Sequence, residues 1–180
     1  METEKAIFGR RSVREYLDKP ISQENIDRLL KAGAMAPSAM DSQQCRYIVI
    51  TDKAKIRELS DKVKEKAGAL GLGATMLEKL RVKEDVIFYG APLLVLFIAE
   101  KNDWAPIDCS LAAQNMMLMG YDLGLGSCFI GFATMLNGDL EIMRSLGIKD
   151  SQKIYCPLIF GYPKNWPHTK SREAKIQKKI

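Results

Sequence analysis

The order of apolar and polar residues predicts alternating helices and strands along the first third of the chain. Ser22 is a suitable N-cap for a helix that runs to about Ala36, where Pro37 ends it. The apolar positions of this helix follow one helical face: Ile26, Leu29, Leu30 and Gly33. Residues 46–51, RYIVIT, then predict a strand, and residues 52–67 predict a charged helix with a single apolar face.

The second half of the chain is more apolar and predicts elements with more complete burial. Residues 91–100, APLLVLFIAE, are typical of a strand covered on both faces, and residues 126–132 and 155–163 predict two further strands. Between the strands over 91–100 and 126–132, residues 106–123 predict a long helix that is apolar on nearly every side. Such a helix has no polar face that could be exposed to water, and in so small a domain we expect another subunit to cover it.

Composition is that of an ordinary globular protein. The 180 residues are 47% hydrophobic and 27% charged, and no internal repeat or linker divides them. We therefore predict one α+β domain over residues 1–180. No apolar run approaches the roughly 20 residues that span a bilayer, and the first twenty residues lack the pattern of a signal peptide. We expect a cytoplasmic protein that does not enter a membrane.

The net charge of +5 is concentrated at the end of the chain. Residues 164–180 contain six basic residues and one acidic residue, so this tail accounts for the whole net charge. The remainder is neutral, which argues against the broadly basic surface of a nucleic-acid-binding protein.

Several common catalytic and metal-binding patterns are missing from the sequence. The four cysteines, at 45, 109, 128 and 156, form no CxxC pair, and we expect them to be reduced and mostly buried thiols. Neither GxGxxG nor GxxxxGK[ST] occurs. His168 is the only histidine, which argues against a catalytic triad and against a histidine-rich metal site. We expect no metal.

The segment FGRRSVREY, residues 8–16, is the densest group of candidate ligands. Arg10, Arg11, Ser12 and Arg14 lie within five positions. Guanidinium groups beside a hydroxyl suit a dianionic phosphate, because arginine offers paired donors and keeps its charge. Taken alone, the segment fits a nucleic acid, a phosphorylated cofactor or a solvated basic turn.

Four segments read together resemble the nitroreductase family of FMN-dependent oxidoreductases. In chain order they are RRSVREY, APSAMDSQQCRYIVI, LAAQNMMLMGYDLGLGSCFIG, and FGYPKN with the later KSR. Tyr16 takes the aromatic position of the first motif. The resemblance implies a nitroreductase-like α+β fold, in which helices flank a central, mixed and mainly antiparallel β-sheet. It also implies an intertwined homodimer with FMN at the subunit interface.

The resemblance further implies a cofactor site built from three parts of the chain. The part that would hold the phosphate, ribityl chain and pyrimidine edge is Arg10, Arg11, Ser12 and Arg14, completed in the tail by Lys170 and Arg172. The part that would reach the flavin of the other subunit is Pro37, Ser38, Ala39, Asp41 and Gln43. The part whose backbone would lie near flavin N5 is Ile130 and Gly131. Each also has a purely structural interpretation: Ser12 as a helix N-cap, Pro37 and Ser38 as a helix stop, and Gly124 and Gly126 as a turn with positive φ.

The implied activity is ping-pong transfer of a hydride from NAD(P)H to flavin N5, and then of two electrons to a small acceptor such as a nitroaromatic or a quinone. No catalytic side chain is required, because the chemistry belongs to the flavin. The chain departs from the family pattern at Asp41, where Asn is usual, and at Gln44 and Cys45, where Pro-Trp is usual. Two alternatives stay open: a flavin-binding redox module without turnover, and a small basic protein that binds nucleic acid.

Overall fold

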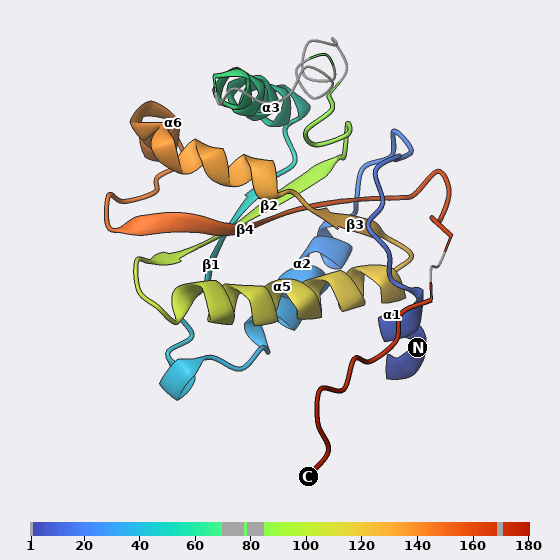
Figure 1. Cartoon of the computed structure of the whole chain (residues 1–180). Coiled ribbons are helices and arrows are strands. Elements are labelled where there is room, and N and C mark those ends of the chain that lie inside the picture. The colour runs from blue at the N-terminus through green and yellow to red at the C-terminus, as the bar shows by residue number, and fades with distance from the viewer. Residues whose placement is uncertain (1, 70–77, 79–84, 169–170) are drawn as a thin grey trace.

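The computed structural model describes residues 2–69, 78, 85–168 and 171–180. Helices lie on both faces of a four-stranded sheet, with α3 and α6 on one side and α2 and α5 on the other (Figure 1). In chain order the elements are α1 (Thr3–Gly9), α2 (Gln23–Ala34), the 3-10 turn η1 (Ala39–Asp41), β1 (Arg46–Ile50), α3 (Lys53–Gly68), β2 (Leu93–Glu100), α5 (Ala105–Asp122), β3 (Gly126–Phe129), the 3-10 segment η2 (Gly131–Gly138), α6 (Leu140–Ser145) and β4 (Gln152–Gly161).

The strands are arranged in the order β1-β2-β4-β3, and each neighbouring pair is antiparallel. A single parallel bridge joins Ser12 to Ser127 at the β3 edge. The expected mixed, mainly antiparallel sheet with flanking helices is therefore confirmed.

Strand β2 separates the two halves of the hydrophobic core. Leu94, Leu96 and Ile98 face the layer that contains α3, η2 and α6. Val95 and Phe97 face the layer that contains α2 and α5. Successive side chains of a strand point to opposite faces, so a strand with helices on both sides must be apolar at every position. Complete burial of each such side chain contributes roughly 1.5–3 kcal/mol.

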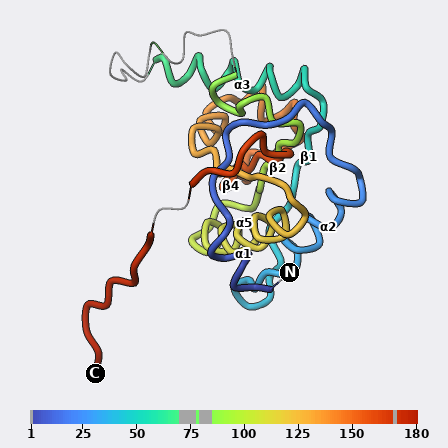
Figure 2. The backbone as a smooth tube through the Cα atoms, turned by 90° about the vertical axis from the view of Figure 1, so that its right-hand side faces the viewer, coloured from blue at the N-terminus to red at the C-terminus, as the bar shows by residue number. Residues whose placement is uncertain are grey.

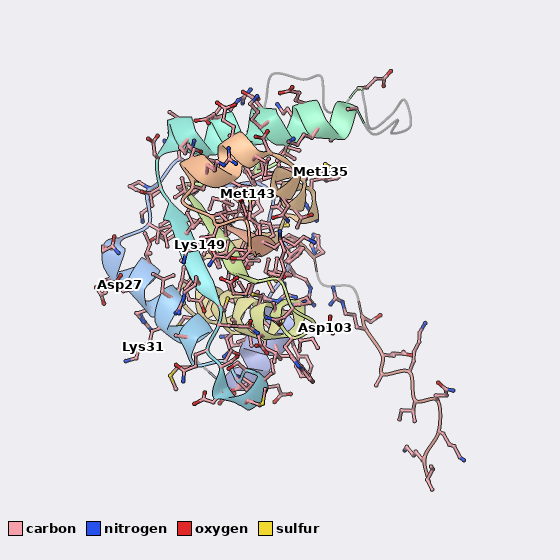
Figure 3. The ribbon with its side chains drawn as sticks, turned by 90° about the vertical axis from the view of Figure 1, so that its left-hand side faces the viewer. Asp27, Lys31, Asp103, Met135, Met143 and Lys149 are labelled. Atoms are coloured by element: carbon pink, nitrogen blue, oxygen red, sulfur yellow. The ribbon has the colours of Figure 1, made fainter. Side chains whose placement is uncertain are left out.

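Side-chain caps begin both charged helices where the sequence predicts. The hydroxyl of Ser22 accepts a hydrogen bond from the backbone N–H of Asn25 at the start of α2. The Asp52 carboxylate accepts two backbone N–H groups at the start of α3. Figure 3 shows the outer face of α2, where Asp27 and Lys31 point into solvent. These helices thus place their polar faces outward and their apolar faces on the sheet.

Helix α5 is covered only in part by its own chain. Its inner face is buried against the sheet and α2, with Cys109, Ala112 and Met116 fully enclosed. Its outer face shows Ile107 and Leu111, whose side chains are 51% and 41% exposed. These two aliphatic side chains of α5 are thus left uncovered by their own chain.

Two strand boundaries and two short helices differ from the expectations. The strand predicted over 126–132 ends at Phe129, because the chain turns into η2 after Ile130. Strand β4 begins at Gln152, three residues earlier than predicted. The short helices α1 and α6 were not predicted, since two helical turns are too short to display a clear period.

The C-terminal residues 171–180 run away from the body of the subunit (Figure 2). Within the described ranges, every helix is too short or too polar to cross a lipid bilayer.

Candidate cofactor site

The basic segment after α1 is extended and lies along the β3 edge of the sheet. The N–H of Val13 donates to the carbonyl of Ser127 at 2.9 Å, and the Val13 side chain is buried. Ser12 and Arg14, on either side of it, are exposed. This alternation is what an extended segment imposes. The interpretation of Ser12 as a helix N-cap is wrong, because the residue pairs with a strand.

Two glycines permit this close packing, each for a different reason. Gly124 has a φ of +73°, so the expected turn with positive φ is present there. Gly126 does not share this conformation, but a Cβ atom on it would lie 2.6 Å from Val13. The sequence therefore indicated the turn correctly at Gly124, whereas Gly126 is needed for the approach of the basic segment.

Several arginines gather around the start of this segment. Arg10 follows α1 directly, and its pKa is lowered first by burial and then by the positive charges of Arg172 and Arg11. The Arg11 side chain donates to the Arg10 carbonyl at 2.6 Å. Within the described parts of the chain, none of the ion pairs to a carboxylate involves Arg10, Arg11, Arg14 or Arg172. Repulsion among these cations would be relieved by an anion of at least two charges.

A cavity of about 660 Å³ opens beside the segment. Its lining consists of Ser12, Arg14 and Glu15 from the segment together with residues 165–168. Trp166 is held there by an edge-to-face contact with Tyr121, with ring centroids 4.9 Å apart. The volume lies within the range of pockets that take cofactor-sized ligands, roughly 300–1,000 Å³. The structure thus joins two predicted cofactor ligands, Ser12 and Arg14, to an aromatic wall that the sequence did not indicate.

The second predicted part of the site, the turn over residues 37–44, is anchored by a buried carboxylate. Asp108 is only 3% exposed. Its oxygens accept the N–H of Ala39 at 3.0 Å and the Gln44 side-chain amide at 2.6 Å, and lie 3.5 Å from the Ser42 hydroxyl. Asn102 donates to the other end of the Gln44 amide at 2.7 Å. Sequence reasoning missed Asp108, although an acid in the first turn of an otherwise apolar helix was a usable signal.

The same turn contains an unusual backbone. Met40, Asp41 and Gln43 have φ values of 51°, 51° and 46°, in the left-handed region that non-glycine residues seldom adopt. Each such residue costs of the order of 1–3 kcal/mol. Within the turn, the N–H of Gln43 donates to the Ser38 hydroxyl, and the Gln43 side chain donates to Asp41. The turn is therefore more than a helix stop after Pro37.

The third part of the predicted site begins where β3 ends. Ile130 is buried, and its N–H donates to the carbonyl of Pro157 at 2.9 Å. Gly131 is exposed, and a Cβ atom on it would meet only Phe129, at 3.8 Å. The backbone at this point is thus held by the sheet and open on its outer side.

One chain does not bring the first and second parts together. The turn is attached at Asp108, near the start of α5, whereas Gly9 and Trp166 pack on Tyr121, near its end. Figure 1 shows α1 beside this far end of α5. At 1.5 Å per residue these two points on α5 are about 20 Å apart. Lys170 lies outside the described residues, and Arg172 is exposed at the start of the outgoing tail.

The sequence model of the nitroreductase family matches residues 7–162. The chain belongs to the nitroreductase family. An FMN reductase (NADPH) from Bacillus subtilis is 29% identical, over 96% of this nitroreductase and 70% of its own length. A 4-nitrobenzoate reductase from Pseudomonas putida is 25% identical, over 87% of this chain and 83% of its own. Among solved structures, a nitroreductase with bound FMN from Bacteroides fragilis matches with a TM-score of 0.86 and 30% identity, over 100% of this chain and 98% of that one.

Proposed function

We propose that this nitroreductase binds FMN without a covalent bond and passes two electrons from NAD(P)H to a small acceptor such as a nitroaromatic or a quinone. Relatives named as an FMN reductase and a 4-nitrobenzoate reductase support the two halves of this reaction. When bound, FMN supplies the hydride acceptor and the later electron donor, in ping-pong order.

The observation that carries the proposal is the group of arginines on and near the basic segment, which form no ion pair with a carboxylate among the described residues. One of them, Arg14, lines the 660 Å³ cavity. The positive charge that a phosphate requires would come from Arg10 and Arg11. Two tail residues, Lys170 and Arg172, would add to it. Ser12 adds a hydroxyl donor. Arginine is suited to this role because its planar donors match two phosphate oxygens at once.

The remaining roles concern the ring of the cofactor. Arg14 faces the cavity and would favour a negative charge on the pyrimidine edge of the ring, a fixed field that needs no rearrangement during turnover. Ile130 and Gly131 would present backbone groups to the ring near N5. No side chain is assigned as a general acid or base, and water that enters the open cavity supplies protons.

The second part of the site leads us to propose a homodimer. The turn is anchored about 20 Å along α5 from the end of this helix that lies near the cavity of its own chain. Its predicted ligands would therefore serve the cavity of a second copy; they are Pro37, Ser38, Ala39, Asp41 and Gln43. The exposed Ile107 and Leu111 give such a copy an apolar surface to cover. We extend the proposal to one domain over residues 1–180, with a tail that completes the phosphate site, and to the cytoplasm as location.

The first experiment measures cofactor content and affinity. The purified protein should be yellow and should release FMN on denaturation. Replacing Arg10 by alanine removes one or two charged hydrogen bonds, each worth roughly 1.5–3 kcal/mol, so FMN affinity should fall about tenfold or more. Lys5→Ala is the matched control, because it removes an exposed positive charge from the adjoining helix α1. Equal affinity in Arg10→Ala and wild type would count against the phosphate assignment.

Two further measurements separate the alternatives. Oxidation of NADH or NADPH that accelerates when a nitroaromatic or a quinone is added distinguishes an enzyme from a redox module without turnover. A nucleic-acid-binding protein would instead show affinity for RNA or DNA that falls steeply with salt.

A further inference from the structure

Two cysteines far apart in sequence meet beside the turn over residues 37–44. The Cys109 thiol donates to the sulfur of Cys45, with the two Sγ atoms 3.4 Å apart. Cys45 lies directly before β1, and Cys109 lies in the second turn of α5. All four cysteines are free thiols, and each of the other two is associated with an oxygen atom, Cys128 with a carbonyl and Cys156 with a hydroxyl.

The two sulfurs differ in access to solvent. Cys109 is completely buried, whereas Cys45 is half-buried and lines a hollow of about 280 Å³ with Pro37 and Ser38. In a chain whose Pro37 and Ser38 face no second copy, a small oxidant that enters this hollow therefore reaches Cys45 first. Cys109 lies behind it, in the position of a thiol that attacks an oxidised partner.

The surroundings also make Cys45 the more acidic thiol. Its pKa is lowered, first by the hydrogen bond from Cys109 and also by a hydrogen bond from Tyr47 and the charge of Arg46; burial and Asp108 act in the opposite direction. The pKa of Cys109 is raised, by the same hydrogen bond first and by burial second. The thiolate is the nucleophile in cysteine oxidation, so the acidic and accessible sulfur is the one that reacts.

We propose that Cys45 and Cys109 are a redox-active dithiol that hydrogen peroxide converts to a disulfide, fixing the turn over residues 37–44 to α5. The Cys45 thiolate attacks one oxygen of the peroxide, the O–O bond breaks, and the released hydroxide takes up a proton to become water. Cys109 then attacks the sulfenic acid of Cys45. The S–S bond forms, the S–O bond breaks, and the Cys109 proton leaves with the hydroxyl group as a second water. One peroxide is reduced, two thiols are oxidised, and a thiol reductant reverses the change.

The geometry requires little movement for this bond. The sulfurs must approach from 3.4 Å to about 2.05 Å, a shift that a half-buried residue at the edge of a turn can make. Gln44, the neighbour of Cys45, and Asp108, the neighbour of Cys109, already form a 2.6 Å hydrogen bond. The disulfide would thus add a covalent connection parallel to an existing polar one. This inference concerns the thiols alone and does not depend on FMN binding.

The test treats the reduced full-length protein with hydrogen peroxide, blocks the remaining thiols by alkylation, and maps peptides by mass spectrometry without reduction. We expect a peptide pair linked through Cys45 and Cys109, with Cys128 and Cys156 alkylated, and its loss after treatment with dithiothreitol. The linked form should unfold at a higher urea concentration than the reduced form, because the bond closes a long loop.

Three variants complete the test. Cys45→Ser should form no intramolecular disulfide. Cys109→Ala should instead accumulate a sulfenic acid on Cys45 that dimedone traps, and this readout survives if the buried substitution costs some stability. Cys156→Ala is the matched control and should form the disulfide as wild type does. The inference is overturned if wild type gives no Cys45–Cys109 link, if Cys45→Ser forms an equivalent link through another cysteine, or if dimedone fails to label Cys45 in Cys109→Ala.

Discussion

Replacing Asp108 by asparagine tests whether one buried carboxylate holds the strained turn over residues 37–44. The substitution preserves shape but exchanges one accepting oxygen for an NH₂ group. Both oxygens of Asp108 accept from donors, Ala39 through one and Gln44 through the other. An asparagine can satisfy only one of these donors and must point its own donor at the other.

The magnitude follows from those contacts. A hydrogen bond to a charged group contributes about 1.5–3 kcal/mol, and a buried donor without an acceptor costs about 1–3 kcal/mol. Asp108→Asn should therefore lower the free energy of unfolding by roughly 2–4 kcal/mol, allowing for local relaxation. Because Met40, Asp41 and Gln43 are strained, the turn should also open more often. If the turn contacts FMN, affinity should fall about tenfold or more.

The assay combines urea unfolding, followed by circular dichroism, with limited proteolysis and an FMN titration. Asp108→Asn should become sensitive to cleavage within residues 38–44. Asp103→Asn is the control, because Asp103 is exposed just before α5 (Figure 3) and tests the general effect of removing an acid near a helix N-terminus. The reasoning would be refuted if Asp108→Asn lowered the free energy of unfolding by less than about 0.5 kcal/mol, the range of ordinary surface substitutions. It would also be refuted if Asp103→Asn lowered the free energy of unfolding by the same amount as Asp108→Asn.

Three further predictions concern assembly, potential and the tail. Leu111→Glu places a charge on the exposed face of α5, so it should convert the dimer to a monomer in sedimentation and lower the FMN content. The control Leu140→Glu, on α6 across the sheet, should change neither the oligomeric state nor the FMN content. An unchanged dimer in Leu111→Glu would contradict the assigned interface. Asp41→Asn should raise the flavin midpoint potential by removing a negative charge near the ring, and an unchanged potential would mean that Asp41 lies away from it. Truncation after Pro167 should weaken FMN binding much more than truncation after Ala174, and added salt should reduce the difference in affinity between the two truncated proteins. If both truncated proteins bind FMN as tightly as the full chain, the tail is not part of the site.

Most of the architecture could be predicted because local patterns and packing agree. The continuous apolar run of β2 requires cover on both faces, and the structure supplies a helical layer on each side. The caps Ser22 and Asp52 mark helix starts that depend only on neighbouring residues. The short helices α1 and α6 escaped prediction because two turns carry too few apolar positions to show a period.

For the candidate site too, local sequence patterns could be predicted, whereas contacts between distant elements could not. The sequence by itself determined the chemistry of the basic segment and the family motifs, since these are properties of residue types in consecutive positions. Only the tertiary structure decided that Asp108 anchors the turn through Gln44, although the two residues are 64 positions apart in the chain. The same is true of the contact between Cys45 and Cys109 and of the separation of the turn from the arginines along α5. Such contacts join residues from different elements, and their distances depend on how the helices pack on the sheet, which no local pattern records.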